Sequence, residues 1–181
     1  MPWRYAKSFA FLTLICCAVA LFAQAPGSPA PAGQSSAAPA PPPQPPKMYG
    51  PPVGIENARK AAEAALAEAR KNNWYMAVAV VDPSGTLVYF ERMDNTQTGS
   101  INVSIEKART AALFKRPSKV FAESVANGGA GLRALGLPGI VPVEGGVPII
   151  INDQIVGAIG VSGDSSDHDG ICAQAGANTL K

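Results

Sequence analysis

One stretch near the end of the chain carries residues that could do chemistry. From Gly157 to Gly170 it holds glycines at 157, 160 and 163 and acidic residues at 164, 167 and 169. It also holds His168, the single histidine of the 181 residues. A phosphate-binding loop, a metal loop and a turn from a strand into a helix all use such residues. The three possibilities require different spacings and different secondary structure.

Neither a nucleotide loop nor a common metal loop fits the spacing. A dinucleotide fingerprint is G-x-G-x-x-G at the first strand-to-helix turn of a βαβ unit, whereas these glycines recur every third residue within an expected strand. An EF-hand with Gly170 at its sixth position would place Gly176 where a bidentate glutamate is needed. Zinc needs three or four nitrogen or sulfur ligands, and His168 and Cys172 are too few.

A structural interpretation explains most of the stretch. Glycines let a neighbouring element approach the strand closely, and Ser165 or Ser166 can cap the helix that follows. Asp167 and Asp169 then favour the dipole of its first turn. His168 is not explained in this way. An exposed imidazole near a helix start can ligate iron, and the alternative is a solvated surface histidine.

Other candidates lie in the middle of the chain. A basic region is interpreted either as a solvated helix face or as a site for an anion or a carboxylate; it contains Lys107, Arg109, Lys115, Arg116 and Lys119. Tyr89 and Met93 could touch an iron, or they pack in the hairpin. The glycine clusters at 127–131 and 144–146 frame an irregular section expected to form a pocket wall. We find no Ser-His-Asp, Cys-His or paired-carboxylate arrangement, so catalytic residues stay unknown.

The elements that position these residues follow the order α-β-β-α-α-β-β-α. Helical spacing of apolar residues predicts helices over 55–71, 100–114 and 118–126, the last capped by Ser118. Strands over 76–81 and 86–92, and over 147–151 and 154–161, are joined by short turns and predict two hairpins. A last helix follows Ser165. Hairpins rather than βαβ units predict an α+β domain, with helices packed on an antiparallel sheet.

The N-terminus predicts export. Arg4 and Lys7 precede an apolar run, and Ala23-Gln24-Ala25 resembles a cleavage site, so residues 1–25 are expected to be a signal peptide cut after Ala25 or Ala23. The run is short for a spanning helix, so a retained anchor is the weaker alternative, and no stable membrane span is expected after cleavage. Residues 26–52 are rich in Pro and Ala and predict a disordered linker. The folded domain is expected over 53–181, in the periplasm or secreted.

Cysteine content and charge narrow the possible roles. Removal of the leader removes Cys16 and Cys17, which leaves Cys172 without an intrachain partner for a disulfide. Residues 53–181 hold 12 Lys and Arg against 13 Asp and Glu, a net charge of −1. This balance gives no support to nucleic-acid binding.

Several short motifs occur in a fixed order between about residues 55 and 180. They are Glu91-Arg-Met-Asp94, Lys107-Ala-Arg-Thr-Ala-Ala112, Phe114-Lys-Arg-Pro-Ser118, Gly145-Gly-Val-Pro-Ile149, Gly157-Ala-Ile-Gly-Val-Ser-Gly163 and Cys172-Ala-Gln-Ala-Gly176. In these motifs the chain resembles the GlcG/HbpS-like haem-binding, or haem-degrading, family, to which the C-terminal domain of PduO-type proteins also belongs.

The resemblance implies a profilin-like α+β fold with about five antiparallel strands, assembly into a homo-oligomer and binding of haem. Roles in haem or iron handling, or in extracellular sensing beside a sensor protein, also follow from it. Iron would be held by His168, or by Thr110, Tyr89 or Met93, with the haem propionates near Lys107 and Arg116. Two alternatives stay open: a small-molecule enzyme or binding module acting on a hydroxy acid or aldehyde, and a purely structural or sensory oligomeric module.

Overall fold

The computed structural model describes residues 47–180. Within them the elements follow the predicted order, with one 3-10 helix inserted in the irregular section. They are α1 (Ile55–Lys71), β1 (Ala77–Val81), β2 (Leu87–Arg92), α2 (Ser100–Phe114), α3 (Ser118–Ala126), η1 (Gly129–Gly136), β3 (Gly146–Ile151), β4 (Gln154–Ser162) and α4 (Ser166–Asn178). The predicted signal peptide, and the linker up to residue 46, lie outside the described residues.

The four strands form one antiparallel sheet in the order β2-β1-β4-β3. A further segment extends it, because Tyr49 makes a parallel bridge to Ile155 at the start of β4. Two turns close the hairpins as predicted: Gly85 has a φ of 82°, and Asn152 and Asp153 have φ values of 51° and 63°. The prediction of an α+β domain built on hairpins is confirmed.

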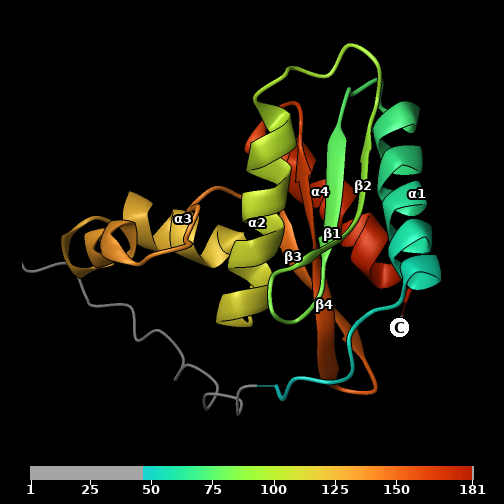
Figure 1. Cartoon of the computed structure of the whole chain (residues 1–181). Helices are drawn as coiled ribbons and strands as arrows, with labels where there is room; N and C mark the ends of the chain where they lie inside the picture. The colour runs from blue at the N-terminus through green and yellow to red at the C-terminus, as the bar shows by residue number, and fades with distance from the viewer. Residues whose placement is uncertain (1–46, 181) are drawn as a thin grey trace, which may run out of the picture. The chain divides into compact units, whose positions relative to one another are not determined.

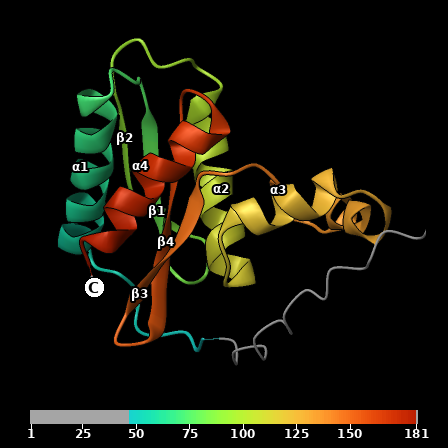
Figure 2. The same ribbon diagram turned by 180° about the vertical axis from the view of Figure 1, so that it is seen from behind.

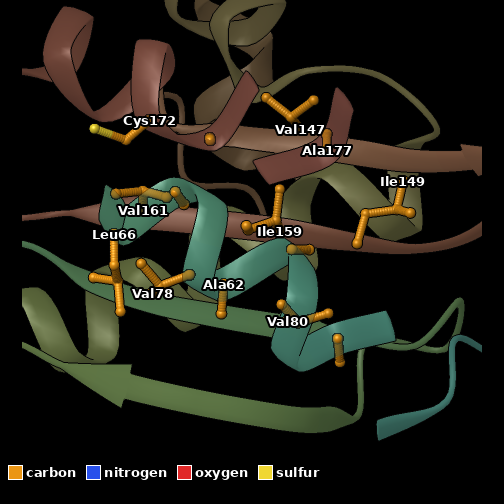
Figure 3. Close-up of a cluster of buried hydrophobic side chains, with 14 of the residues drawn as sticks. Ala62, Leu66, Val78, Val80, Val147, Ile149, Ile159, Val161, Cys172 and Ala177 are labelled. Atoms are coloured by element: carbon orange, nitrogen blue, oxygen red, sulfur yellow. The ribbon is translucent and has the colours of Figure 1, made fainter. Parts of the chain in front are cut away.

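Helices cover both faces of the sheet. α1 and α4 lie on one face and α2 lies on the other (Figures 1 and 2). Alternation along the strands explains this arrangement, since successive side chains point to opposite faces. Figure 3 shows the core under α1 and α4, which is formed mainly by Ala62, Leu66, Val78, Val80, Val147, Ile149, Ile159, Val161, Cys172 and Ala177.

The face toward α2 is built from very small residues. Ala79 of β1 pairs with Gly160 of β4, and a Cβ atom at Gly160 would lie 2.0 Å from the backbone oxygen of Ser104 in α2. Gly163 is equally close to backbone, with 1.9 Å from the same hypothetical atom to the oxygen of Tyr75. The predicted reason for these glycines, close approach of neighbouring elements, is therefore confirmed.

α3 and η1 project to one side of the sheet instead of covering it (Figure 1). The structure corrects the predicted role of Ser118. Pro117 is the N-cap of α3, and no side chain caps this helix. The buried Ser118 hydroxyl instead donates to the backbone oxygen of Val143 at 2.6 Å and accepts from the backbone nitrogen of Gly146 at 2.8 Å. It therefore fastens the end of the irregular section to α3.

Before it reaches α1, the chain runs beside the start of β4. The Tyr49 hydroxyl donates to the backbone oxygens of Ala112 and Leu113, at 2.9 and 3.1 Å, and Lys115 Nζ lies 4.1 Å from the centre of the Tyr49 ring. Residues 47–52, the last part of the predicted linker, thus contact the domain. No helix within residues 47–180 is long and apolar enough to cross a bilayer.

Candidate functional site

His168 lies in the first turn of α4, which begins as the sequence predicts. The N-cap is Ser165, whose hydroxyl accepts from the backbone nitrogen of His168 at 3.4 Å. The imidazole stacks on the indole of Trp74, with 3.8 Å between the ring centres and 13° between their planes. Trp74 in turn packs against the core under α1 and α4. The side chain of His168 is therefore held in place although 38% of it is exposed.

The two nitrogens of this ring have different surroundings. Nδ1 is buried and has no hydrogen-bond partner among the described residues, while Oδ1 of Asp164 lies 3.4 Å from it. This separation is longer than an ordinary hydrogen bond. Because Nδ1 is buried, the exposed part of the ring lies elsewhere. Nε2 is thus the nitrogen left for a ligand, but Asp164 makes no hydrogen bond to Nδ1 of the kind that usually supports a metal-bound histidine.

Next to His168, Asp169 forms a buried ion pair with Lys107. Lys107 Nζ donates to Asp169 Oδ2 at 2.6 Å, and the two side chains are only 1% and 3% exposed. Oδ1 of Asp169 accepts from the backbone nitrogen of Asp164 at 3.3 Å. Burial raises the pKa of the Asp169 carboxyl, and the Lys107 ammonium opposes that rise. The pair connects α2 to α4, which lie on opposite faces of the sheet.

Glycines make room for this ion pair at the start of β3. Gly145 has a φ of 127°, and a Cβ atom there would lie 2.9 Å from Cβ of Asp169 and 3.0 Å from Nζ of Lys107. A Cβ atom on Gly146 would lie 2.1 Å from the backbone oxygen of Lys107. The glycines that sequence patterning assigned to a pocket wall therefore pack directly on a buried charge pair.

A pocket of about 300 Å³ opens beside these glycines. Its lining is Pro117, Lys119, Glu144, Gly145, Gly146, Val147, Gly170, Ile171 and Gln174. Lys119 Nζ donates to Glu144 Oε2 at 2.5 Å, and this hydrogen bond raises the pKa of the Lys119 ammonium. The pocket therefore combines an ion pair with an apolar wall, and it borders α4 one turn beyond His168.

The other predicted iron ligands do not converge on His168. The Thr110 hydroxyl is buried on α2, where it donates to the backbone oxygen of Glu106 and accepts from the backbone nitrogen of Val141. Tyr89 donates to Glu91 at 2.8 Å, and this hydrogen bond raises the pKa of the phenol. None of these contacts involves the ring of His168.

Met93 is placed differently from those two residues. It is partly buried against the core, and its backbone nitrogen donates to the oxygen of Met76 at 3.0 Å. Gly163 also lies against Met76, so Met93 and the loop before α4 share one end of the sheet. The structure brings Met93 to the same end as His168 but records no contact between the two side chains.

The basic region does not form one cluster of free charge. Lys107 pairs with Asp169, as described, and Lys119 pairs with Glu144. Arg109 pairs with Glu106 at 2.6 Å, and Arg116 lies over the ring of Phe121, with 5.6 Å from Cζ to the ring centre. The Lys107 side chain is only 1% exposed, and the predicted roles of Lys107 and Arg116 as partners of haem propionates stay predictions.

The residues that sequence reasoning missed are Trp74, Asp164 and Asp169 as partners of His168 and Lys107. The contacts of Trp74 and Asp169 join positions 94 and 62 residues apart, which no local pattern reveals, whereas Asp164 is only four residues from His168. A signal for Asp169 was available: a carboxylate beside a glycine-rich loop is costly to bury unless it has a partner of opposite charge. Among the described residues, no group of three or more His, Cys, Asp or Glu side chains could hold a metal ion.

Comparison with known proteins agrees with this architecture. A family model described as "Haem degrading protein HbpS-like" matches residues 53–178. The chain belongs to the HbpS-like family. Protein GlcG of Escherichia coli K12 is 44% identical over 95 residues, which is 52% of this chain and 69% of that protein. The resemblance predicted from the short motifs is thus confirmed.

Solved structures of the HbpS-like family share the fold. The crystal structure of HbpS is 32% identical, with a TM-score of 0.67, and the match covers 74% of this chain and 94% of HbpS. A complex of PduOC with haem is 23% identical, with a TM-score of 0.65, covering 72% of this chain and 96% of PduOC. At that identity, the likeness to PduOC concerns the fold alone.

Proposed function

We propose that this protein binds haem and that His168 ligates the iron through Nε2. The observation that carries the proposal is the environment of the imidazole. It is stacked on Trp74, its Nδ1 is buried 3.4 Å from Oδ1 of Asp164 without a hydrogen bond, and 38% of the side chain is exposed. A fixed imidazole with an accessible Nε2 is suited to ligate a metal ion. Membership of a family named for haem degradation supports the same ligand.

Exposed apolar side chains occur on the elements next to His168. Tyr75 follows Trp74 in the chain and is 52% exposed, and Ile171 is 49% exposed one turn along α4. Such side chains would favour a porphyrin beside His168, because stacking and burial of the ring would release water. Bound haem would supply a redox-active iron. The residues of this chain hold the imidazole in place and provide the apolar contact.

A haem titration tests the proposal. Addition of haem to the purified chain should shift the Soret band, and His168→Ala should weaken binding. Loss of a group that only supports a metal ligand costs about 10–100-fold in affinity, so loss of the ligand itself should cost at least about tenfold. Asp167→Ala is the matched control, since Asp167 is an exposed carboxylate in the same helical turn. The absence of any Soret shift with the unsubstituted chain would overturn the proposal.

A second candidate function uses the neighbouring pocket. Its volume of about 300 Å³ is at the small end for ligand sites, and it presents Lys119, Glu144 and Gln174 beside an apolar wall. Such a lining suits a short hydroxy acid or aldehyde, as a substrate or only as a ligand. Screening of these compounds for turnover and binding, with Lys119→Ala as the control, tests this candidate. Retention of binding in Lys119→Ala would count against the pocket.

We also propose that the protein is exported and assembles with copies of itself, which would place haem handling or sensing outside the cytoplasm. Arg4, Lys7 and the following apolar run support export, and N-terminal sequencing of the mature protein tests it. Exposed leucines on η1 and after it support assembly, with Leu132, Leu135 and Leu137 being 50%, 62% and 46% exposed. Light scattering of the purified chain would show a monomer if the assembly proposal is wrong.

A further inference from the structure

The start of β4 has an edge that β1 does not cover. β1 pairs with β4 from Ala77, opposite Ser162, to Val81, opposite Ala158, and the chain then turns toward β2. On the other edge, β3 continues to the first residue of β4. Residues 154–157 therefore have one edge without β1 beside it. Their backbone N–H and C=O groups on that edge need other partners.

Residues 48–53, which we call the clasp, supply these partners. The backbone oxygen of Met48 accepts from the nitrogen of Ile155 at 2.9 Å, and the nitrogen of Gly50 donates to the oxygen of Ile155 at 2.9 Å. The clasp passes the start of β4 in both views of the ribbon (Figures 1 and 2). Over a few residues it thus takes the place of a neighbouring strand.

The clasp and the strand are matched in shape where they touch. Val53 is only 5% exposed, and its backbone nitrogen donates to the oxygen of Val156 at 2.8 Å. A Cβ atom at Gly157 would lie 2.9 Å from Cγ1 of Val53, so this glycine leaves the space that Val53 fills. A Cβ atom at Gly50 would lie 2.8 Å from Cβ of Gln154. The clasp therefore lies close against β4 and contributes to the core.

Tyr49 fastens the clasp to α2. Its hydroxyl donates to the backbone oxygens of Ala112 and Leu113, which belong to the last turn of that helix. Carbonyl groups in the last turn have no partner within the helix, so a hydroxyl there satisfies them. The ammonium of Lys115 lies over the Tyr49 ring, 4.1 Å from its centre. Release of Tyr49 would therefore loosen the whole clasp.

We propose that the clasp is a conformational device that keeps the edge of β4 closed and prevents a second copy of this chain from pairing there. An uncovered strand edge is a template for pairing with another chain, and two copies would present the same backbone groups to one another. Ile155 and Val156 are 1% and 5% exposed while the clasp is in place. Gly54 is a suitable pivot, because a Cβ atom there would meet nothing within 4 Å and α1 begins at the next residue. The device does not depend on haem binding.

Hydrogen exchange of the full chain, followed by NMR, tests the release of the clasp. The amide of Ile155 reports on it, because its acceptor is the oxygen of Met48. The amide of Val161 is the internal control, since it donates to Gly145 at the other end of β4. Tyr49→Ala removes a hydrogen bond and a cation–π contact, so exchange at Ile155 should become about tenfold faster or more. Tyr49→Phe keeps the ring and should have a smaller effect.

Two further variants and a measurement of size complete the test. Gly50→Pro removes the backbone donor to Ile155 and should also release the clasp. Met48→Ala is the matched control, because its side chain is 69% exposed and its backbone oxygen remains. Light scattering over a range of concentrations should show a species larger than that of the unsubstituted chain for Tyr49→Ala and Gly50→Pro only. An unchanged rate at Ile155, an equal acceleration at Val161, or release without any larger species would overturn the proposal.

Discussion

Replacement of Lys107 by methionine removes one partner of the buried ion pair and leaves the other in place. The side chain of Asp169 would keep its surroundings, in which it is 3% exposed, with one backbone N–H group from Asp164 as the remaining donor. Breaking a buried pair in this way costs about 3–5 kcal/mol. Methionine has nearly the length of lysine, so the loss would come from the charge and not from a cavity.

The penalty should depend on pH in a defined direction. The folded-state pKa of Asp169 is already raised by burial, and Lys107→Met removes the ammonium that opposes the rise. An acid whose folded-state pKa lies above its unfolded value contributes most stability below the unfolded value, about 3.9, and loses it as the pH rises through the folded value. The variant should therefore be destabilised more at about pH 8 than at about pH 5, because a lower pH favours the protonated carboxyl, which carries no unpaired charge.

Urea denaturation at both pH values measures the effect. The double variant Lys107→Met/Asp169→Asn removes both charges and should recover much of the stability, since a neutral pair avoids the cost of an unpaired ion. An equal loss in the single and double variants, or a loss below about 1 kcal/mol at both pH values, would refute the account of Lys107 as the partner of a buried charge.

Three further changes test other contacts. Gly160→Ala places a methyl group against the backbone of Ser104 and should lower the free energy of unfolding by about 1–3 kcal/mol or more, measured by urea denaturation. Ser118→Ala leaves the backbone nitrogen of Gly146 without its acceptor and should cost about 1–3 kcal/mol in the same assay. Burial raises the pKa of the Cys172 thiol to about 12, so the unfolded chain loses this proton first and stability should fall as the pH rises from about 8.5 toward 12. In Cys172→Ala this part of the loss of stability should be absent. A pH profile of stability identical to that of the unsubstituted chain would contradict the raised pKa of the thiol.

The sequence was sufficient for most of the fold because its signals are local. The bounds predicted for α1, α2 and α3 agree with the structure, since apolar spacing and Pro117 define them within one element. The cap of α3 was predicted wrongly, because serine at a helix start usually caps, whereas Ser118 makes longer-range bonds to Val143 and Gly146. The prediction for Ser118 failed because its partners are distant in the sequence, and not because of its residue type.

The same limit applies to the candidate site. His168 was selected because it is unique and near a helix start, and the structure gives it a fixed ring with one accessible nitrogen. Asp169 was interpreted as a carboxylate that favours the helix dipole, but it lies in a buried pair with Lys107. Lys107 and Asp169 are 62 residues apart in the sequence, so local patterns could not show that the two charges form a buried pair. The packing of α2 against the sheet brings them together.

The small residues on the α2 face of the sheet limit which substitutions this protein can tolerate. Where α2 crosses β4 at Gly160, backbone meets backbone, so no repacking of side chains can absorb an added methyl group. Under α1 and α4, exchanges among Val, Ile and Leu can compensate one another. A saturation-mutagenesis map should thus be intolerant along the α2 contact and more permissive at the Val, Ile and Leu positions of the opposite face, though not at Gly176, where a Cβ atom would lie 2.6 Å from the backbone oxygen of Ala61. These glycines therefore fix the architecture at the α2 contact, whereas His168 lies outside that contact, in the first turn of α4.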